Sequence, residues 1–468
     1  MREKGDQLEL LLTVSRDRPG TLSAQIERQF RGAIRDGSLR PGTPVPSTRD
    51  LATELGVSRK IVVDAYAQLA AEGYLAMRQG AQPRVATGPF GTPDASLADA
   101  DRGPAMFDFL PARPDVSSFP RTAWARCLRD AVAGITVADL GYGDAFGMPA
   151  LRDGLADYLG RVRGVVADRG RVLVTNGYLQ GLGLVCRTLA RRGARRIALE
   201  DPSSSEEPLI AARAGLEPVH VPVDDLGLRV DALDRAGADA VVVTPAHQSP
   251  TGVVLAPERR TALVTWLRDR GAYAVEDDYD AEYRYDRPAV GALQGLAGDH
   301  VVYAGTASKV LAPALRLGWL VVPPALVDEI RSEKQLADQG TARIEQLAFA
   351  HFLARGALDR HLRRMRVRYR GKRDATIAAL AAELPEATVR GIAAGLHVTV
   401  ELPPRDDEEA IRCAAARRGV AIGTMDAYRS TVDGPPTLIL GYSQMSESRL
   451  RHGIAELAQA IRESRADG

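Results

Sequence analysis

Four short apolar segments of this chain end in polar side chains of the types that do chemistry. The segments are VLVT, VVVT, AYAV and VVYA, and the polar residues that follow them are 176–180, 245–252, 276–280 and 305–309. In open α/β sheets, ligands bind just beyond the carboxyl ends of the strands. We therefore expect the four polar segments to meet in one crevice.

A lysine, a carboxylate and a group of phosphate donors in one crevice would suit a phosphorylated pyridine aldehyde. The amine of Lys309 could condense with the aldehyde as a Schiff base, provided that burial or a neighbouring cation lowers its pKa. Asp277 could keep a proton on the ring nitrogen, and Tyr279 could donate to the phenolic oxygen. The phosphate could be bound by side chains and backbone N–H groups of Thr306, Ser308, Arg316, Gly177 and Tyr178.

Each of these residues also has an ordinary structural interpretation. A lysine after a strand is usually a solvated charge, and an aspartate such as Asp277 or Asp278 can simply cap the end of a strand. Two histidines, His247 and His397, are more often structural than catalytic, so no catalytic task is assigned to them.

Apolar runs of strand length, alternating with helical stretches, must position these groups. RVLVTNG, RIALEDP, AVVVTP, AYAVEDD, VVYAG and GWLVVP follow one another in this way. The alternation predicts an α/β fold with a largely parallel sheet that is covered by helices on both faces. From about residue 380, GLHVTVEL, GVAIG and TLILGY predict the strands of a smaller α+β lobe.

A compact helical module with a hairpin is predicted near the N-terminus. Apolar residues recur at every fourth position from Leu22 to Ile34, which is typical of an amphipathic helix. Ser47 and Asp50 form a capping pattern for a short second helix, and Ser58 is expected to cap a third. YLAMRQGAQPRV then predicts a small β-hairpin. A linker rich in Gly, Pro, Ala and Asp follows over 87–105, where no apolar period could form a core.

The composition excludes several classes of protein. Lys plus Arg number 61 and Asp plus Glu number 60, so any preference for nucleic acid must be local. The three cysteines are Cys127, Cys186 and Cys413, a spacing that suggests neither a metal site nor a disulfide framework. No apolar run approaches the roughly 18 residues of a membrane span. We expect a soluble, cytoplasmic protein without a membrane or metal partner.

At this point, the motifs resemble two known families. GTASKVLAPALRLGW is similar to the lysine segment of type I aminotransferases, and TPAHQSPTG, EDDYDAEYRYD and GYGDAFGMPALRDGLADYL are similar to its companion motifs. LSAQIERQFRGAIRDG and PSTRDLATELGVSRKIVVDAYAQLAAEGYL resemble the GntR-type winged helix-turn-helix. Joined in this order, the two halves resemble the MocR/GabR family of transcription regulators.

The resemblance implies a domain organisation and a cofactor. It implies a winged helix-turn-helix DNA-binding domain over 18–86, the linker over 87–105, and a type I aminotransferase-like fold over 106–468 with a small α+β lobe over about 380–468. The cofactor would be pyridoxal 5'-phosphate, bound to Lys309. In the family, a tyrosine in the position of Tyr142 reaches the phosphate of the neighbouring subunit, which implies a homodimer with shared sites.

The resemblance also implies contacts with a double-stranded DNA operator. These would come from the second helix and from the first turn of the recognition helix, which is well placed to meet base edges or phosphates. The residues are Arg49, Ser58, Arg59 and Lys60. The wing departs from the family form at Gln82 and Arg84, so no contact with the minor groove is assigned to it.

Two departures bear on the ligand site. Ser204 falls where many relatives stack an aromatic ring on the pyridine, and Ile439 falls where amino-acid-converting relatives carry an arginine that clamps the substrate carboxylate.

Two hypotheses follow. The chain is a regulator that senses pyridoxal phosphate, an amine or an amino acid, or it is an aminotransferase with an appended DNA-binding module. The missing arginine and the intact DNA-binding module favour the regulator.

Overall fold

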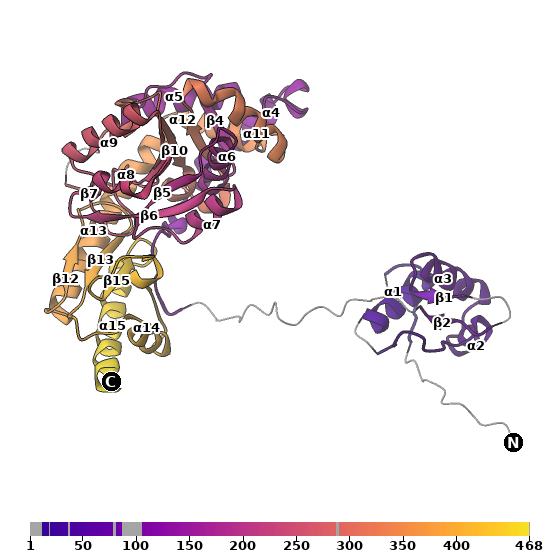
Figure 1. The fold of residues 1–468 in the computed structure, drawn as a ribbon. Helices are drawn as coiled ribbons and strands as arrows, with labels where there is room; N and C mark the ends of the chain where they lie inside the picture. Colours follow the sequence, from indigo (N-terminus) through magenta and orange to yellow (C-terminus); the bar gives the residue numbers. More distant parts are fainter. Residues whose placement is uncertain are drawn as a thin grey trace. The chain divides into compact units, whose positions relative to one another are not determined.

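The structure, a computed structural model, describes residues 12–17, 19–35, 38–77, 81–86, 105–286 and 290–467. The chain divides into two compact units, Met1–Gly103 and Pro104–Gly468 (Figure 1). Each unit has its own hydrophobic core. The predicted linker lies outside the described residues, apart from Ala105 at its end.

The N-terminal unit consists of three helices and one hairpin. They are α1 (Leu22–Arg35), α2 (Thr48–Glu54), α3 (Arg59–Ala71) and the antiparallel strands β1 (Leu75–Ala76) and β2 (Arg84–Val85). The predicted apolar face of α1 is confirmed, because Ile26, Phe30 and Ile34 are buried. The ring of Phe30 packs edge-on against Tyr66 of α3, with 5.5 Å between the ring centroids.

The two serines predicted to cap helices in this unit differ in their hydrogen bonding. Ser47 caps α2 as predicted, since its hydroxyl accepts a hydrogen bond of 3.2 Å from the Asp50 N–H. Ser58 is the N-cap residue of α3, as predicted, but its side chain makes no capping hydrogen bond.

The larger unit is built on an eight-stranded sheet. Its order is β4-β11-β10-β9-β8-β5-β6-β7, and only β11 and β7 run antiparallel to their neighbours among these described strands. This confirms the prediction of a largely parallel sheet. The strands are β4 (Val172–Thr175), β5 (Arg196–Asp201), β6 (Glu217–Asp224), β7 (Gly227–Leu228), β8 (Ala240–Val243), β9 (Tyr273–Asp278), β10 (Val301–Thr306) and β11 (Gly318–Val321).

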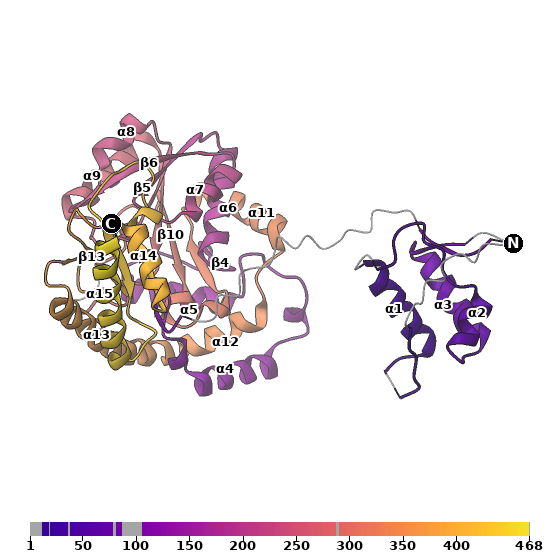
Figure 2. The same cartoon turned by 90° about the horizontal axis from the view of Figure 1, so that it is seen from below.

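Helices cover both faces of this sheet, as successive residues of β10 show. Tyr303 packs in the cluster formed with α5 (Pro149–Arg163) and α12 (Arg343–Ala354), and Val301 packs in the cluster formed with α9 (Pro257–Arg270). Val302 and Ala304 point to the opposite face, since side chains alternate along a strand. The helices on that face are α6 (Tyr178–Arg191), α7 (Glu206–Arg213) and α11 (Val327–Asp338), which lie together on one side of the sheet in Figure 2.

A second sheet of five strands forms the smaller lobe, in the order β12-β13-β15-β14-β3. Its strands are β3 (Phe107–Phe109), β12 (Thr388–Arg390), β13 (His397–Glu401), β14 (Val420–Thr424) and β15 (Thr437–Gly441). Its helices are α13 (Ala357–Glu383), α14 (Glu408–Arg417) and α15 (Glu447–Asp467). The three strands predicted for this lobe are confirmed, but β12 and β3 were not predicted. β3 comes from the start of the unit and pairs in parallel with β14.

The larger unit also contains the helix α4 (Arg121–Gly134) and the single turns α8 (Leu233–Ala236) and α10 (Ala307–Val310). None of the helices in the described part of the chain has the length and apolar character needed to span a membrane.

Candidate functional site

A cavity of about 460 Å³ lies at the carboxyl ends of the strands of the larger sheet. Its lining brings together most of the side chains predicted from the sequence, namely Tyr178, Asp277, Tyr279, Thr306, Ser308, Lys309 and Arg316. Gly177 adjoins it as the residue before α6. Tyr142 does not line it and lies elsewhere on this unit.

Lys309 lies on α10, the single turn of helix that follows β10. The Thr306 hydroxyl caps this turn by accepting a hydrogen bond from the Ser308 N–H at 3.1 Å. The Lys309 Nζ donates to the carbonyl oxygen of Ala112 at 2.7 Å. Burial lowers the pKa of Lys309, while the nearby Asp277 carboxylate acts in the opposite direction. A lowered pKa increases the fraction of neutral amine, which is the form that attacks a carbonyl carbon.

Asp277 presents a carboxylate to this cavity. Among the described residues, no side chain or backbone group donates a hydrogen bond to it. Burial raises its pKa well above the ordinary value, and Glu207 and Asp278 raise it further, whereas Lys309 lowers it. Burying a carboxyl group without a hydrogen-bond partner is costly unless a ligand supplies a donor or a positive charge. The protonated nitrogen of a pyridine ring is such a group.

Tyr279 is held by a buried network on its far side. Its hydroxyl lies 3.1 Å from His247 Nδ1, and this nitrogen also lies 3.1 Å from both carboxylate oxygens of Asp280. A hydrogen bond also joins Tyr279 to Ser249, another residue of the cavity. Burial raises the pKa of Tyr279, and Asp280 raises it further, so the phenol stays protonated. His247 thus positions Tyr279, a role not predicted from the sequence.

A group of donors at one end of the cavity suits a phosphate. Arg316 has a left-handed backbone with φ 50°, and its Nη2 donates to the Asn176 carbonyl at 2.7 Å. A Cβ atom at Gly177, where φ is 88°, would lie 2.8 Å from that Nη2, so glycine leaves the space that the guanidinium fills. The hydroxyl groups of Thr306 and Ser308 lie 3.0 Å apart beside the start of α6. Guanidinium, hydroxyl and helix N-terminal groups together fit a dianionic phosphate.

Two buried glutamates also line the cavity and were not singled out in the sequence. The Tyr178 hydroxyl donates to Glu207 at 2.7 Å, and the Thr244 hydroxyl donates to Glu200 at 2.5 Å. Burial raises the pKa of each carboxyl group to about 7. In Sequence analysis, candidates were sought only among the residues directly after each strand. Glu207 follows the end of β5 by six residues, so a search extended into the first turn of α7 would have found it.

The raised pKa of Glu207 makes a prediction about stability. Its carboxyl pKa is about 7 in the folded chain against 4.5 ordinarily, so the folded state binds the proton more tightly. The stability that this proton contributes is therefore present below pH 4.5 and is lost as the pH rises through 7. Glu207→Gln should remove on the order of 1–3 kcal/mol of the difference in unfolding free energy between pH 5 and pH 8.

Urea unfolding of the cofactor-free chain, followed by tryptophan fluorescence, measures this difference. All three tryptophans lie in the larger unit, so the signal reports on that unit alone. Glu258→Gln, an exposed glutamate on α9, is the matched control and should keep the wild-type pH dependence. An equal pH dependence in the Glu207→Gln variant and the wild type would contradict the prediction.

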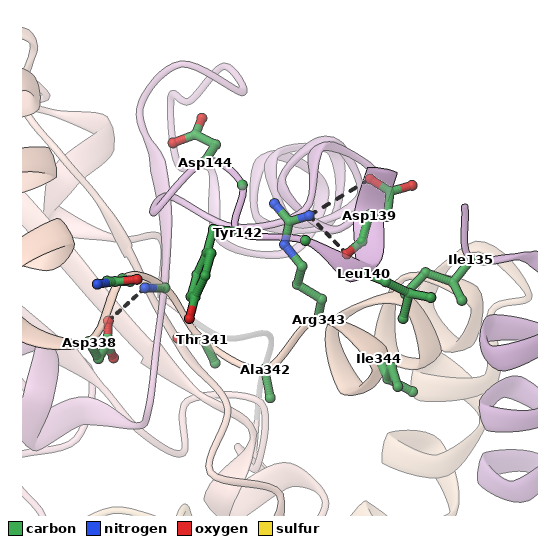
Figure 3. A pocket seen from close by; sticks show the side chains of 14 residues that line it. Ile135, Asp139, Leu140, Tyr142, Asp144, Asp338, Thr341, Ala342, Arg343 and Ile344 are labelled. Atoms are coloured by element: carbon green, nitrogen blue, oxygen red, sulfur yellow. Dashed lines mark hydrogen bonds and ion pairs between the residues drawn. The ribbon is translucent and has the colours of Figure 1, made fainter. Parts of the chain in front are cut away.

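Tyr142 lies in a separate hollow on the same unit, lined by Ile135 and the segments 139–144 and 338–344 (Figure 3). Its side chain is 92% exposed in the single chain and points toward Thr341 and Ala342 in Figure 3. Arg343 fixes the loop before Tyr142, because its Nη1 donates to the Asp139 carbonyl at 3.0 Å. Within one chain, Tyr142 therefore cannot serve the cavity that holds Lys309.

The four predicted DNA contacts are exposed on the N-terminal unit. Arg49 lies in the first turn of α2, Ser58 precedes α3, and Arg59 and Lys60 begin it. Arg59 Nε lies 3.5 Å from the Thr48 hydroxyl, so the starts of α2 and α3 lie together. The cationic side chains of Arg49, Arg59 and Lys60 and the hydroxyl of Ser58 therefore lie at one end of the unit. Such a group can bind phosphates or base edges.

Comparison with family models matches both units. Residues 115–457 match the aminotransferase class I and II model, and residues 22–85 match the model of bacterial regulatory proteins of the gntR family.

Two curated proteins are similar to the chain over nearly its whole length. The HTH-type pyridoxine biosynthesis transcriptional regulator PdxR of Corynebacterium glutamicum is 32% identical over 97% of this chain and 99% of that protein. The probable rhizopine catabolism regulatory protein MocR of Rhizobium meliloti is 32% identical over 96% of each chain. Both similarities span the two units.

Among solved structures, the larger unit is similar to an α-aminoadipate aminotransferase. LysN of Thermus thermophilus, complexed with N-(5'-phosphopyridoxyl)-L-leucine, has a TM-score of 0.69 and 26% identity, covering 77% of this chain and 93% of that one.

Proposed function

Because the chain belongs to the MocR-type transcriptional regulators, in which a gntR-family segment precedes an aminotransferase class I and II domain, we propose that it is a pyridoxal-phosphate-dependent regulator of transcription. Residues 18–86 bind an operator in double-stranded DNA, and residues 106–468 sense a ligand. Residues 87–105 link the two. The protein acts in the cytoplasm, where its DNA lies.

The observation that carries this proposal is the exposed basic start of α3 in a chain that also keeps the lysine cavity. Arg59 and Lys60 lie in the first turn of α3 with their side chains exposed. In winged helix-turn-helix domains, the first turn of this helix meets the major groove. An aminotransferase has no use for such a surface, whereas a regulator needs both parts.

The residues of the cavity fit pyridoxal phosphate. This cofactor supplies an aldehyde that forms an imine with a primary amine and a ring that withdraws electrons. Lys309 supplies the amine, Asp277 holds a proton at the ring nitrogen, and Tyr279 donates to the phenolic oxygen. The phosphate is bound by Thr306, Ser308, Arg316 and the N–H groups that follow Gly177, among them that of Tyr178.

A second copy of the chain completes the site. Val137, Leu140 and Tyr142 are 89%, 64% and 92% exposed and lie within six residues of one another. Exposed apolar side chains in such a cluster are typical of a protein interface. In a homodimer, this cluster packs on the partner subunit and Tyr142 reaches the phosphate of the partner's cofactor.

Operator binding with and without cofactor tests the proposal. DNA fragments enriched from a random pool by the full-length protein serve as operators. Arg59→Ala should weaken binding about tenfold or more, since a base or phosphate contact of this kind contributes roughly 1–3 kcal/mol. Pyridoxal phosphate should change the affinity of the wild type several-fold, because a switch needs unequal binding to its two states.

The control for Arg59 is Arg28→Ala, which removes an exposed arginine from α1. This variant should keep wild-type affinity, and both variants should take up cofactor normally. Unchanged operator affinity in Arg59→Ala would exclude α3 as the DNA-reading helix, and failure to enrich any fragment would overturn the proposal.

The alternative is an active aminotransferase with an appended DNA-binding module. The similarity of the larger unit to LysN favours it, because both share one fold. Ile439, buried in the middle of β15, disfavours it, because an apolar side chain cannot clamp a substrate carboxylate. Keto acid formation over many turnovers from a panel of amino acids would establish the alternative.

A further inference from the structure

Acidic side chains outnumber basic ones in the lining of the cavity. Among the residues that line it, the cations are Lys309 and Arg316, and the carboxylates are Glu200, Glu206, Glu207 and Asp277. Under the proposed function, both cations are used, Lys309 by the aldehyde and Arg316 by the phosphate. No cationic side chain of the lining is then left for a ligand that enters beside the cofactor.

The arginines adjacent in sequence to the lining are also engaged. Arg113 follows Ala112, and its Nη1 binds the Asp108 carboxylate at 2.6 Å. Arg429 follows Tyr428, and its guanidinium binds Asp426 at 2.8 Å and donates to the Pro435 carbonyl at 2.7 Å. A ligand carboxylate would therefore have to displace an existing ion pair to find a guanidinium here.

Glu206 presents an exposed carboxylate to this cavity. It is the first residue of α7, and its carboxylate accepts a hydrogen bond from the Ser204 hydroxyl at 2.6 Å. Its side chain is exposed, while the neighbouring Glu207 is buried. The Glu206 charge acts on both Lys309 and Tyr428, so it lies within electrostatic range of the reactive amine and of the small lobe.

The small lobe holds this part of the wall in place. The Ser203 N–H donates to the Tyr428 carbonyl at 3.0 Å, and the Asp201 carboxylate accepts from the Thr431 N–H at 2.7 Å. The segment that carries Ser204 and Glu206 is therefore tied to the small lobe at its start. A ligand that binds Glu206 contacts a wall built from both lobes.

From these contacts we infer that the effector of this chain is a short diamine, a ligand with a second positive charge and no carboxylate, whose far ammonium group binds Glu206. The inference rests on the proposed function, because it takes Lys309 and Arg316 as occupied by pyridoxal phosphate. Among the amines and amino acids that could act as effectors, the inference selects the diamines. A carboxylate in the same place would meet Glu206 as a like charge, which is unfavourable.

Three probes of equal chain length test this inference on the full-length, cofactor-loaded protein. They are 1,4-diaminobutane, butylamine and 4-aminobutanoate, with affinity measured by calorimetry and by the shift in melting temperature. A charge-assisted hydrogen bond to Glu206 should make the diamine bind roughly tenfold more tightly than butylamine. The amino acid should bind more weakly than butylamine.

Two variants locate the effect. Glu206→Gln should reduce the advantage of the diamine over butylamine to about twofold or less, and Glu206→Arg should make 4-aminobutanoate the preferred probe. Glu258→Gln, the exposed control on α9, should leave the wild-type order unchanged.

The outcomes separate this inference from the proposed function. Equal affinities for diamine and butylamine, or preference for 4-aminobutanoate in the wild type, would overturn the inference while cofactor loading remains normal. A diamine advantage that survives in Glu206→Gln would also overturn it. Failure of the wild type to bind pyridoxal phosphate would overturn the inference together with the proposed function.

Discussion

Replacing Lys309 with alanine is expected to abolish the visible absorption band that pyridoxal phosphate gives with the wild-type chain. The band requires a covalent imine, and Lys309 is the lysine whose amine lies in the cavity beside Asp277 and the phosphate donors. Its loss should be complete rather than partial, because an alanine methyl group cannot condense with an aldehyde. Absorbance titration of both proteins with pyridoxal phosphate checks the result.

The chain allows a direct identification of the modified residue. It has five lysines, so borohydride reduction followed by peptide mass mapping distinguishes them all. The competitor is Lys334, which is also buried but whose Nζ binds Gln180, Asp338 and Thr341 at 2.9, 2.7 and 2.9 Å. Label on Lys334, or a band of normal intensity in Lys309→Ala, would refute the assignment of Lys309.

Much of this site was predicted from the rule that ligands bind beyond the carboxyl ends of parallel strands, because this rule depends only on local sequence and on topology. Strand-length apolar runs place their following residues at one edge of a parallel sheet, whatever the details of packing. Thr306, Ser308, Lys309 and Tyr279 all line the cavity that this rule predicted. These residues could be predicted without knowing the order of the strands in the sheet.

Other parts of the wall depend on contacts between distant segments and could not be predicted in this way. Tyr428 reaches the cavity because its carbonyl accepts from Ser203, 225 residues earlier in the sequence. The strand β3 joins the small lobe by pairing with β14, although three residues carry too little pattern to predict a strand. Tyr142 is the reverse case, since a family motif suggested a contact that one chain alone does not make.

Asp277 and Asp278 show how strand geometry separates two adjacent acids. Successive side chains of β9 point to opposite faces, so Asp277 faces the cavity and Asp278 points into the buried interior on the other side. There, Asp278 Oδ2 accepts from Arg163 Nε at 2.6 Å and from the Tyr303 hydroxyl at 2.7 Å. The sequence suggested a capped strand end as the alternative role, but the actual partner of Asp278 is an arginine on α5, 115 residues away.

This buried pair leads to the second large prediction, which concerns the stability of the larger unit. The side chains of Arg163 and Asp278 are 1% and 2% exposed, so neither charge can be solvated if its partner is removed. Burial alone would lower the pKa of Arg163, but the Asp278 carboxylate outweighs it and keeps the guanidinium charged. Asp278→Asn should therefore lower the free energy of unfolding by about 3–5 kcal/mol.

Urea unfolding at pH 7, followed by tryptophan fluorescence, measures the loss, and two further variants show that an unpaired charge causes it. The double variant Arg163→Met with Asp278→Asn removes both charges and should recover part of the stability lost in Asp278→Asn, because no unpaired charge is then buried.

Two residues earlier on α5, Arg161 pairs with Asp359 at 2.9 Å, but its side chain is 59% exposed. Asp359→Asn should cost less than about 1 kcal/mol, since water solvates the arginine that it leaves behind. A loss in Asp278→Asn no larger than that in Asp359→Asn would show that the Arg163–Asp278 pair does not stabilise the sheet on which the cofactor site is built.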